Sequence, residues 1–192
     1  MTDALCVCTP NTDPGSVFTT YSSRHCKPWS VSSYALEFVA VLESGVLNGK
    51  NFQGHQVTDG FILEVYKDNR GLPTVGCGHL VVDVDQLKVG DKITLQRAQS
   101  LLRADLDRME GRLNRDIWVP LYQFEYDALI SIVFNCGPFT GADALVTKVN
   151  SGEYNKLFDF ILPYRVGHNK NLKRRRFQEA RLFASGVYDA AH

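Results

Sequence analysis

The chain has 192 residues, of which 44% are hydrophobic and 22% charged, and its formal net charge is +0. This length suits one compact domain or a domain with a short arm. The 11% of aromatic residues argues against a disordered chain, and no apolar run approaches the roughly 18 residues of a membrane-spanning helix. Neutrality argues against a surface devoted to nucleic acid, although residues 1–93 sum to −3 and residues 94–192 to +3.

Residues 1–32 are rich in Thr, Ser, Pro and Cys and have no hydrophobic periodicity, so an irregular N-terminal arm is expected. No charged segment followed by an apolar run is present, which argues against a cleavable signal peptide. The possible metal ligands of the arm lack the paired spacing of a zinc site, and no metal is predicted; they are Cys6, Cys8, His25 and Cys26. One disulfide within the arm and reduced cysteines both stay open.

The next segment changes period from that of a helix to that of strands. Apolar residues at helical spacing predict a helix over residues 33–45. Residues 48–60 have turn-forming composition and predict an exposed loop. A period of two then predicts strands at 61–66 and 72–76 around a tight turn, with a third short strand at 79–82.

From Thr94 onward the periodic segments are helical, and Thr94 itself is a suitable N-cap. The segment 121–135 is apolar nearly all round, which predicts a buried central helix. Further helices are expected at 142–150, 153–161 and 170–185. The predicted fold is therefore α+β: an N-terminal helix and a small antiparallel β-hairpin lobe, about 58–83, joined to a larger helical lobe, about 94–190.

Two carboxylates and a hydroxyl can converge in this fold. Glu43 closes the first helix, Asp68 lies in the hairpin turn, and Thr74 follows across the hairpin. Such a set suits glycosidic cleavage, because one carboxyl protonates the leaving oxygen while the other supports an attacking water or the developing positive charge. On residue types alone this pattern is not specific, since Asp68 also reads as an ordinary solvated residue.

Several segments resemble the phage-type lysozymes, glycoside hydrolase family 24. They are Tyr66-Lys67-Asp68, Gly71, Thr74-Val75-Gly76-Cys77-Gly78-His79, Tyr126-Asp127-Ala128-Leu129, Phe134-Asn135-Cys136-Gly137, and Leu172 with Arg174, Arg175 and Glu179. The resemblance covers about residues 33–190 in the right order. It implies a lysozyme-like catalytic domain at 33–192.

This resemblance implies a muramidase that hydrolyses the β-1,4 bond between N-acetylmuramic acid and N-acetylglucosamine in peptidoglycan, without a cofactor. Glu43 would be the general acid, Asp68 the second carboxylate and Thr74 the residue that holds the water. Leu80 and Phe134 would line the glycan cleft, although each also reads as ordinary core. Inversion at the anomeric carbon is the family's usual outcome, with carboxyl groups roughly 6.5–9.5 Å apart.

One departure from the family concerns the spacing of the acids. Glu43 and Asp68 are 25 positions apart, which is wider than usual in the family. The surplus is the 48–60 stretch. Lengthening a loop severalfold adds only about 1–2 kcal/mol of closure entropy. It is interpreted as a tolerated surface insertion, with an extended cleft or a partner site as alternatives. Glu37 and Glu64 stay open as alternative acids.

Three other features have structural interpretations. His79 is predicted to pair with a carboxylate of the following helix, Asp105 in the first place and Asp107 as the alternative. Cys77 is expected to line the core or the cleft, and Cys136 to be a packed thiol. Six basic side chains gather on the last helix, where they indicate a solvated face, a brace for the cleft or contacts with acidic wall polymer; they are Lys170, Lys173, Arg174, Arg175, Arg176 and Arg181.

Alternatives to hydrolysis are an inactive wall-binding or adaptor domain with the same fold, and a lytic transglycosylase. Peptidoglycan glycan strands are the expected partner, joined by an immunity protein if the chain is a secreted antibacterial effector. Nucleic acid and membrane insertion are not expected, and a monomer is. The chain is expected to be made in the cytoplasm and to act on the wall, in the periplasm or outside the cell. Holin-dependent release of a phage endolysin and contact-dependent secretion of an effector are the two routes.

Overall fold

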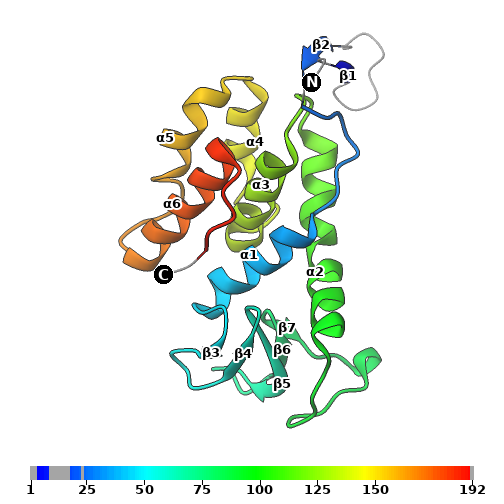
Figure 1. The fold of residues 1–192 in the computed structure, drawn as a ribbon, viewed down its shortest axis with the longest axis vertical. Helices are drawn as coiled ribbons and strands as arrows, with labels where there is room; N and C mark the ends of the chain where they lie inside the picture. The colour runs from blue at the N-terminus through cyan, green and yellow to red at the C-terminus, as the bar shows by residue number, and fades with distance from the viewer. Residues whose placement is uncertain (1–3, 9–17, 23, 191–192) are drawn as a thin grey trace. The chain divides into compact units, whose positions relative to one another are not determined.

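The computed structural model describes residues 4–8, 18–22 and 24–190, with side chains for 24–169 and 171–190. The chain forms two compact units (Figure 1). We call Ser33–Asp105 the sheet unit, and Leu106–Tyr188 together with the described residues up to Ser32 the helical unit. This division differs from the predicted one, because the residues just before Ser33 belong to the helical unit and are not a separate arm.

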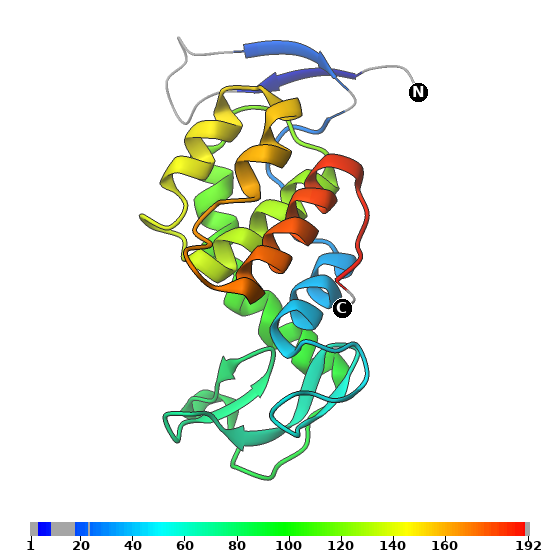
Figure 2. The same cartoon turned by 90° about the vertical axis from the view of Figure 1, so that its left-hand side faces the viewer.

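The sheet unit contains a helix followed by a five-stranded antiparallel sheet (Figure 2). The strand order β3-β4-β5-β6-β7 follows the chain, so each strand pairs with the next one through a turn. The elements are α1 (Ser33–Ser44), β3 (Gly49–Lys50), β4 (Gln56–Thr58), β5 (Phe61–Lys67), β6 (Pro73–Gly76), β7 (His79–Leu80), the 3-10 helix η1 (Asp83–Asp85) and the first half of α2 (Leu95–Asp116). The α+β class, α1 and the three strands β5, β6 and β7 were predicted correctly, although β7 is shorter than expected.

A tight contact joins α1 to the turn that enters β5. A Cβ atom on Gly60 would lie 2.7 Å from the backbone nitrogen of Val41 and 2.9 Å from Cβ of Ala40, so only glycine permits this approach. The N–H of Gly60 also donates to the carbonyl oxygen of Leu47 at 2.8 Å. The last turn of α1, which carries Glu43, is therefore fixed against the sheet.

The prediction of an exposed loop over 48–60 is wrong, because this stretch contains β3 and β4 and extends the sheet. Asn51 is buried, and its side-chain oxygen accepts hydrogen bonds from the N–H groups of Gln53 and His55 at 3.1 and 2.9 Å. Val57 is buried and pairs with Ile62 of β5. One buried amide and one buried apolar side chain thus order a segment whose composition resembles that of a loop.

The helical unit is built around α3 (Gln123–Cys136), which is buried at every position from Glu125 to Val133. This matches the predicted central helix. α3 packs on α6, and α6 packs on α5. The remaining helices are the second half of α2, α4 (Asp143–Asn150), η2 (Tyr154–Lys156), α5 (Leu157–Ile161) and α6 (Lys170–Ser185). Among the helices that the structure describes, none combines the length and the apolar character needed to span a membrane.

Two of the arginines on α6 are buried ions. Arg176 and Glu179 are fully buried, and Arg175 is nearly so. Arg176 donates through Nη1 to Glu179, and Arg175 donates through Nε to the same carboxylate at 3.0 Å. Ser131 of α3 donates to it at 2.7 Å, and Nη2 of Arg176 donates to Asn135 at 2.7 Å. The solvated-face interpretation is therefore wrong for Arg175 and Arg176, since these ions connect α6 to α3.

The prediction of an irregular arm over 1–32 is wrong in part. β1 (Ala4–Cys8) and β2 (Phe18–Ser22) form an antiparallel pair. Residues 24–32 have no regular structure beyond an isolated bridge from His25 to Leu121, but they belong to the helical unit and bury Trp29. Such contacts come from single side chains and not from a repeating apolar face, so hydrophobic periodicity does not detect them.

Asp127 on α3 forms hydrogen bonds with both the segment before α1 and the segment after α6. Its fully buried carboxylate accepts hydrogen bonds from the N–H and hydroxyl of Ser32, at 3.1 and 2.6 Å. It also accepts from the side chain of Gln123 at 2.9 Å and from the hydroxyl of Tyr188 at 2.6 Å. One carboxylate therefore links the segment before α1, the central helix and the segment after α6.

Candidate active site

Glu43 lies in the last turn of α1 and is exposed. The helix ends there because Gly45 adopts a φ of 83°, in the left-handed region that glycine occupies most readily. The N–H of Gly45 donates to the carbonyl oxygen of Val41 at 2.8 Å. Most other positions of α1 are buried, so the end of this helix brings a carboxyl group to the surface of the sheet unit.

Asp68 lies in the turn between β5 and β6, and its own side chain shapes that turn. Its Oδ1 atom accepts hydrogen bonds from the N–H groups of Arg70 and Leu72, at 2.8 and 2.9 Å. The pKa of Asp68 is below its usual value, chiefly because the N–H of Leu72 stabilises the charged form, with help from the N–H and guanidinium of Arg70. Asp68 is therefore an ionised and fixed carboxylate, which suits a base better than an acid.

Thr74 stands on β6 and is buried. Its hydroxyl donates to the carbonyl oxygen of Leu72 at 3.2 Å. Leu72 thus contacts both side chains, because its N–H holds Asp68 and its carbonyl accepts from Thr74. Since the hydroxyl hydrogen of Thr74 is used in this bond, its oxygen can accept a hydrogen bond from a water molecule. Leu72 is missing from the predicted site because backbone groups leave no signal in residue type.

The two alternative acids lie elsewhere in the sheet unit. Glu37 is exposed on α1, nearly two turns before Glu43. Glu64 is on β5, with its carboxylate 3.7 Å from Nζ of Lys92 and its side chain 57% exposed. Neither residue belongs to the end of α1 or to the turn that holds Asp68.

The two predicted cleft residues fall in different units. Leu80 ends β7 in the sheet unit and is 43% exposed, so the ordinary-core interpretation is wrong for it. Phe134 lies in α3 of the helical unit and is half-buried. Glu43, Asp68, Thr74 and Leu80 therefore share one compact unit, and Phe134 belongs to the other.

His79 has two carboxylate partners. Its Nδ1 lies 3.0 Å from Asp105 on α2, and its Nε2 lies 3.1 Å from Asp85 in η1. Burial lowers the pKa of His79, but the hydrogen bonds to both aspartates outweigh it and the pKa is raised overall. Asp85 was absent from the sequence-based expectation, because a short 3-10 helix in a loop carries no periodic signal. His79 thus holds the β7 end, η1 and α2 together.

The cysteines fall into two groups. Cys26 is disulfide-bonded, while Cys77, which is buried, and Cys136, which is half-buried, form no disulfide. Burial raises the pKa of Cys136, whose Sγ donates to the carbonyl oxygen of Gly141. The side chains of Cys6 and Cys8, which the zinc and disulfide hypotheses involve, lie outside the described residues. Within the part of the chain that is described, no group of three metal-ligating side chains occurs.

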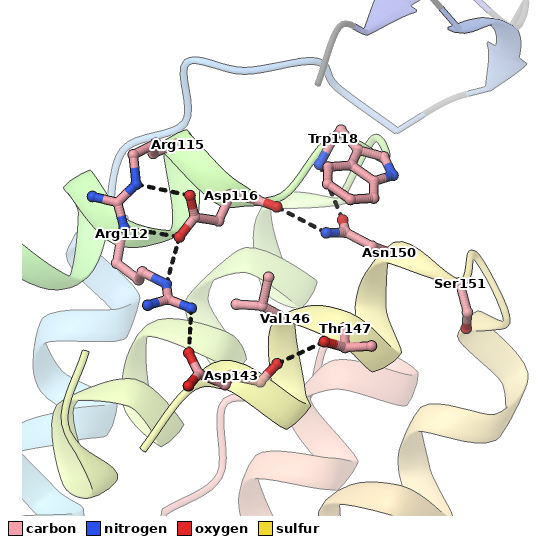
Figure 3. Close-up of a pocket in the computed structure, with 9 residues that line it drawn as sticks. All are labelled: Arg112, Arg115, Asp116, Trp118, Asp143, Val146, Thr147, Asn150 and Ser151. Atoms are coloured by element: carbon pink, nitrogen blue, oxygen red, sulfur yellow. Dashed lines mark hydrogen bonds and ion pairs between the residues drawn. The ribbon is translucent and has the colours of Figure 1, made fainter. Parts of the chain in front are cut away.

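A hollow of about 670 Å³ on the helical unit contains none of the predicted site residues (Figure 3). Its charged groups are paired with one another: Arg115 contacts Asp116 at 2.7 Å, and Arg112 contacts Asp143 at 2.7 Å. The hollow is lined by Arg112, Arg115, Asp116, Trp118, Asp143, Val146, Thr147, Asn150 and Ser151. This chemistry is that of a structural ion network between α2 and α4.

Comparisons with known proteins show which proteins this chain is similar to. A family model described as phage lysozyme matches residues 56–179. The match includes Asp68, Thr74, Leu80 and Phe134, and it begins after Glu43. The chain is 37% identical over 131 residues to the endolysin of Salmonella phage P22, covering 66% of this chain and 90% of that protein.

Two further similarities point the same way. The chain is 39% identical over 117 residues to the endolysin of Acyrthosiphon pisum secondary endosymbiont phage 1, which covers 60% of this chain and 73% of that one. The structure of this chain is similar to the crystal structure of a P22 lysozyme mutant, with a TM-score of 0.66 and 29% identity. That alignment covers 82% of this chain and 99% of the other.

Proposed function

The chain belongs to the phage lysozyme family, and on this premise we propose that Glu43, Asp68 and Thr74 carry out its reaction. The enzyme is a glycoside hydrolase of the muramidase type, and it acts on peptidoglycan of the bacterial cell wall. The proposed bond is the β-1,4 linkage between N-acetylmuramic acid and N-acetylglucosamine. The reaction needs two carboxyl groups in different protonation states and a directed water molecule.

In the proposed mechanism Asp68 is the base. It accepts one hydrogen of a water molecule whose other hydrogen is donated to the hydroxyl oxygen of Thr74. The water oxygen then attacks the anomeric carbon while the glycosidic bond breaks, and Glu43 gives its proton to the leaving oxygen. Exchange of protons with solvent restores both carboxyl groups. The product is inverted, which requires carboxyl groups roughly 6.5–9.5 Å apart.

The observation that supports this assignment best is the double contact of Leu72. Its peptide group fixes the carboxylate of Asp68 through the N–H and the hydroxyl of Thr74 through the carbonyl. Both side chains are therefore oriented before substrate arrives, which is the arrangement that directs a water efficiently. The low pKa of Asp68 keeps it ionised, as a base must be.

The proposal is tested with three glutamate variants of the sheet unit. Glu43→Gln is expected to lose nearly all release of reducing ends from purified peptidoglycan. Glu37→Gln, on the same helix, and Glu64→Gln, on β5, are the matched controls and are expected to keep wild-type activity. Loss of activity in Glu64→Gln with full activity in Glu43→Gln would move the acid to β5.

Product analysis separates the alternatives to hydrolysis. Mass spectrometry is expected to find reducing muropeptides, whereas a transglycosylase would yield anhydro-muropeptides. NMR of the first product formed is expected to show the inverted anomer. A wall-binding domain without turnover would release no new ends while still sedimenting with peptidoglycan.

We further propose that the protein acts on the wall as a monomer. Release through a holin, as for a phage endolysin, is one route, and contact-dependent secretion of an effector with its own immunity protein is the other. Sedimentation analysis tests the monomer, and a holin or immunity gene beside the coding sequence distinguishes the routes.

A further inference from the structure

The β3–β4 hairpin is an ordered part of the sheet next to the strand that leads to the proposed site. Residues up to His55 precede the segment that matches the family model. The hairpin is nevertheless well built: Asn51 and His55 pair through their backbones at 3.0 Å, and the side chain of Asn51 closes the turn. β4 then pairs with β5, the strand that leads to Asp68. A well-ordered hairpin of this kind fixes the position of the side chains it carries.

His55 is the residue through which this hairpin reaches the strand. Its ring centroid lies 4.2 Å from that of Tyr66 on β5, with an angle of 37° between the planes. Both side chains are half-buried. Within the described residues, the two ring nitrogens of His55 have no hydrogen-bond partner, and the hydroxyl of Tyr66 has none either. The pair therefore offers an aromatic surface with polar atoms still to be satisfied.

Tyr66 connects this pair to the proposed reaction centre. It lies directly opposite Thr74 in the β5–β6 register, and opposite residues in an antiparallel pair share one face of the sheet. Burial raises the pKa of Tyr66, and the nearby Cys77 and the negative charge of Asp68 raise it further. The hydroxyl thus stays protonated and can donate a hydrogen bond beside Asp68 and Thr74.

We propose that His55 and Tyr66 form a sugar subsite beside Thr74, in which their rings pack on one N-acetylated sugar of the glycan strand and their unpartnered polar atoms bond its hydroxyl or acetamido groups. This inference rests on the proposed function. Sugars bind where an aromatic face and a few convergent polar groups meet, because the ring covers C–H groups while the polar atoms replace lost water. The β3–β4 hairpin then serves to place His55, which acts as a binding and positioning residue and not in proton transfer.

The test compares variants of His55 and Tyr66 in the full chain. His55→Ala is expected to raise KM for soluble glycan strands about fivefold to tenfold, because one ring contact and one hydrogen bond are lost. Its kcat is expected to stay within about twofold, since Asp68 and Thr74 are held by Leu72. Tyr66→Phe, which removes only the hydroxyl, is expected to raise KM by a smaller factor. Tri-N-acetylchitotriose is the binding probe, and its Kd is expected to rise in parallel in an NMR titration.

Two further variants separate contact from folding. Phe52→Ser changes a side chain that is 86% exposed at the tip of the same hairpin, and it is expected to leave KM and Kd unchanged. His55→Phe keeps a ring against Tyr66 and is expected to recover part of the loss. Wild-type KM in His55→Ala, or an equal loss in Phe52→Ser, would overturn the subsite. If wild type is active and Glu43→Gln is not, such a result refutes this inference alone and leaves the proposed function intact.

Discussion

The helical unit buries its principal carboxylates, whereas the sheet unit keeps the two carboxylates of the proposed site at or near the surface. Glu179, Asp127 and Glu125 are each at most 2% exposed, and each is surrounded by donors. Glu125, for example, accepts hydrogen bonds from Arg24 and from the N–H of Tyr122. In the sheet unit Glu43 is exposed, and Asp68 has a side-chain exposure of 23%.

This difference separates stability from chemistry. A buried carboxylate that satisfies several donors holds helices together, and removing it leaves those donors uncompensated. A surface carboxylate held by backbone N–H groups contributes less to packing and can meet a substrate. The comparison therefore predicts opposite outcomes for substitutions in the two units: lost activity with retained stability in one, lost stability in the other.

The largest expected effect is on activity, at Asp68. Asp68→Asn keeps an oxygen for the N–H groups of Arg70 and Leu72 but loses the base, so kcat is expected to fall about 10²–10⁴-fold. The urea midpoint is expected to stay close to wild type. Asp83→Asn, an exposed aspartate of the same unit, is the control and is expected to leave both properties unchanged. A large loss of stability in Asp68→Asn would contradict the separation of stability from chemistry between the two units.

The next effect is on stability, at Glu179. Glu179→Ala leaves the guanidinium groups of Arg175 and Arg176 buried without their counter-charge. The free energy of unfolding is expected to fall by about 3–5 kcal/mol. Urea denaturation followed by circular dichroism measures it. Asp159→Ala on α5, an exposed position, is expected to change it by less than about 0.5 kcal/mol.

A smaller effect is expected at Asp127, which joins three segments. Asp127→Asn keeps the shape but weakens bonds to Ser32 and Tyr188, so stability is expected to fall by about 2–3 kcal/mol. Tyr188→Phe removes one donor and leaves the carboxylate in place, at an expected cost of about 1 kcal/mol. An equal loss in the free energy of unfolding for the two variants would show that the charge of the Asp127 carboxylate does not hold the three segments together. Urea denaturation of both variants decides.

The smallest effect depends on pH and concerns His79. Because its pKa is raised in the folded state, the protonated ring contributes stability that is fully present below the unfolded pKa of about 6.5 and is lost as pH rises through the folded value. His79→Gln is expected to cost about 1–2 kcal/mol near pH 5.5 and clearly less near pH 9.

Asp85, one of the two partners of His79, sets the lower limit of the pH range in which this pair stabilises the fold. The pKa of Asp85 is lowered: burial opposes the charge, but the N–H of Val82 and His79 outweigh it. Its contribution is present above its unfolded pKa of about 3.9 and is lost as pH falls through the lower folded value. Asp85→Asn is therefore expected to reduce the pH dependence of wild type, as measured by urea denaturation at both pH values. A pH-independent cost for His79→Gln would contradict a charged histidine.

The regular elements could be predicted because their signals are local. α1, the β5–β6 hairpin and α3 each follow from a period of 3.6 or 2 together with glycine or turn residues at their ends. The spacing of Asp68 and Thr74 predicted that the two residues lie on either side of one tight hairpin turn. The family resemblance rested on this hairpin together with segments of α3 and α6, and the comparisons with known proteins confirm it.

Contacts between distant segments could not be predicted in the same way. Nothing in the composition of residues 48–60 indicates that Asn51 and Val57 are buried and add two strands to the sheet. The burial of Arg176 with Glu179 likewise contradicts the polarity of the α6 sequence. In each case the energy comes from one or two side chains that meet partners far along the chain, so no repeating pattern records it.

The chain is neutral, with an acidic first half and a basic second half. Its charged residues have two different roles, because some are buried as structural pairs and others lie at the surface. The sequence alone determined the fold class and the hairpin that carries Asp68 and Thr74, because these depend on local periodicity and on turn chemistry, while its motifs carried the resemblance to the family. The tertiary structure decided which charges are buried as structural pairs, which stay at the surface, and that the ring of His55 packs against Tyr66. Burial and pairing depend on neighbours brought together only by folding, and for that reason charge counts could not assign a role to any single residue.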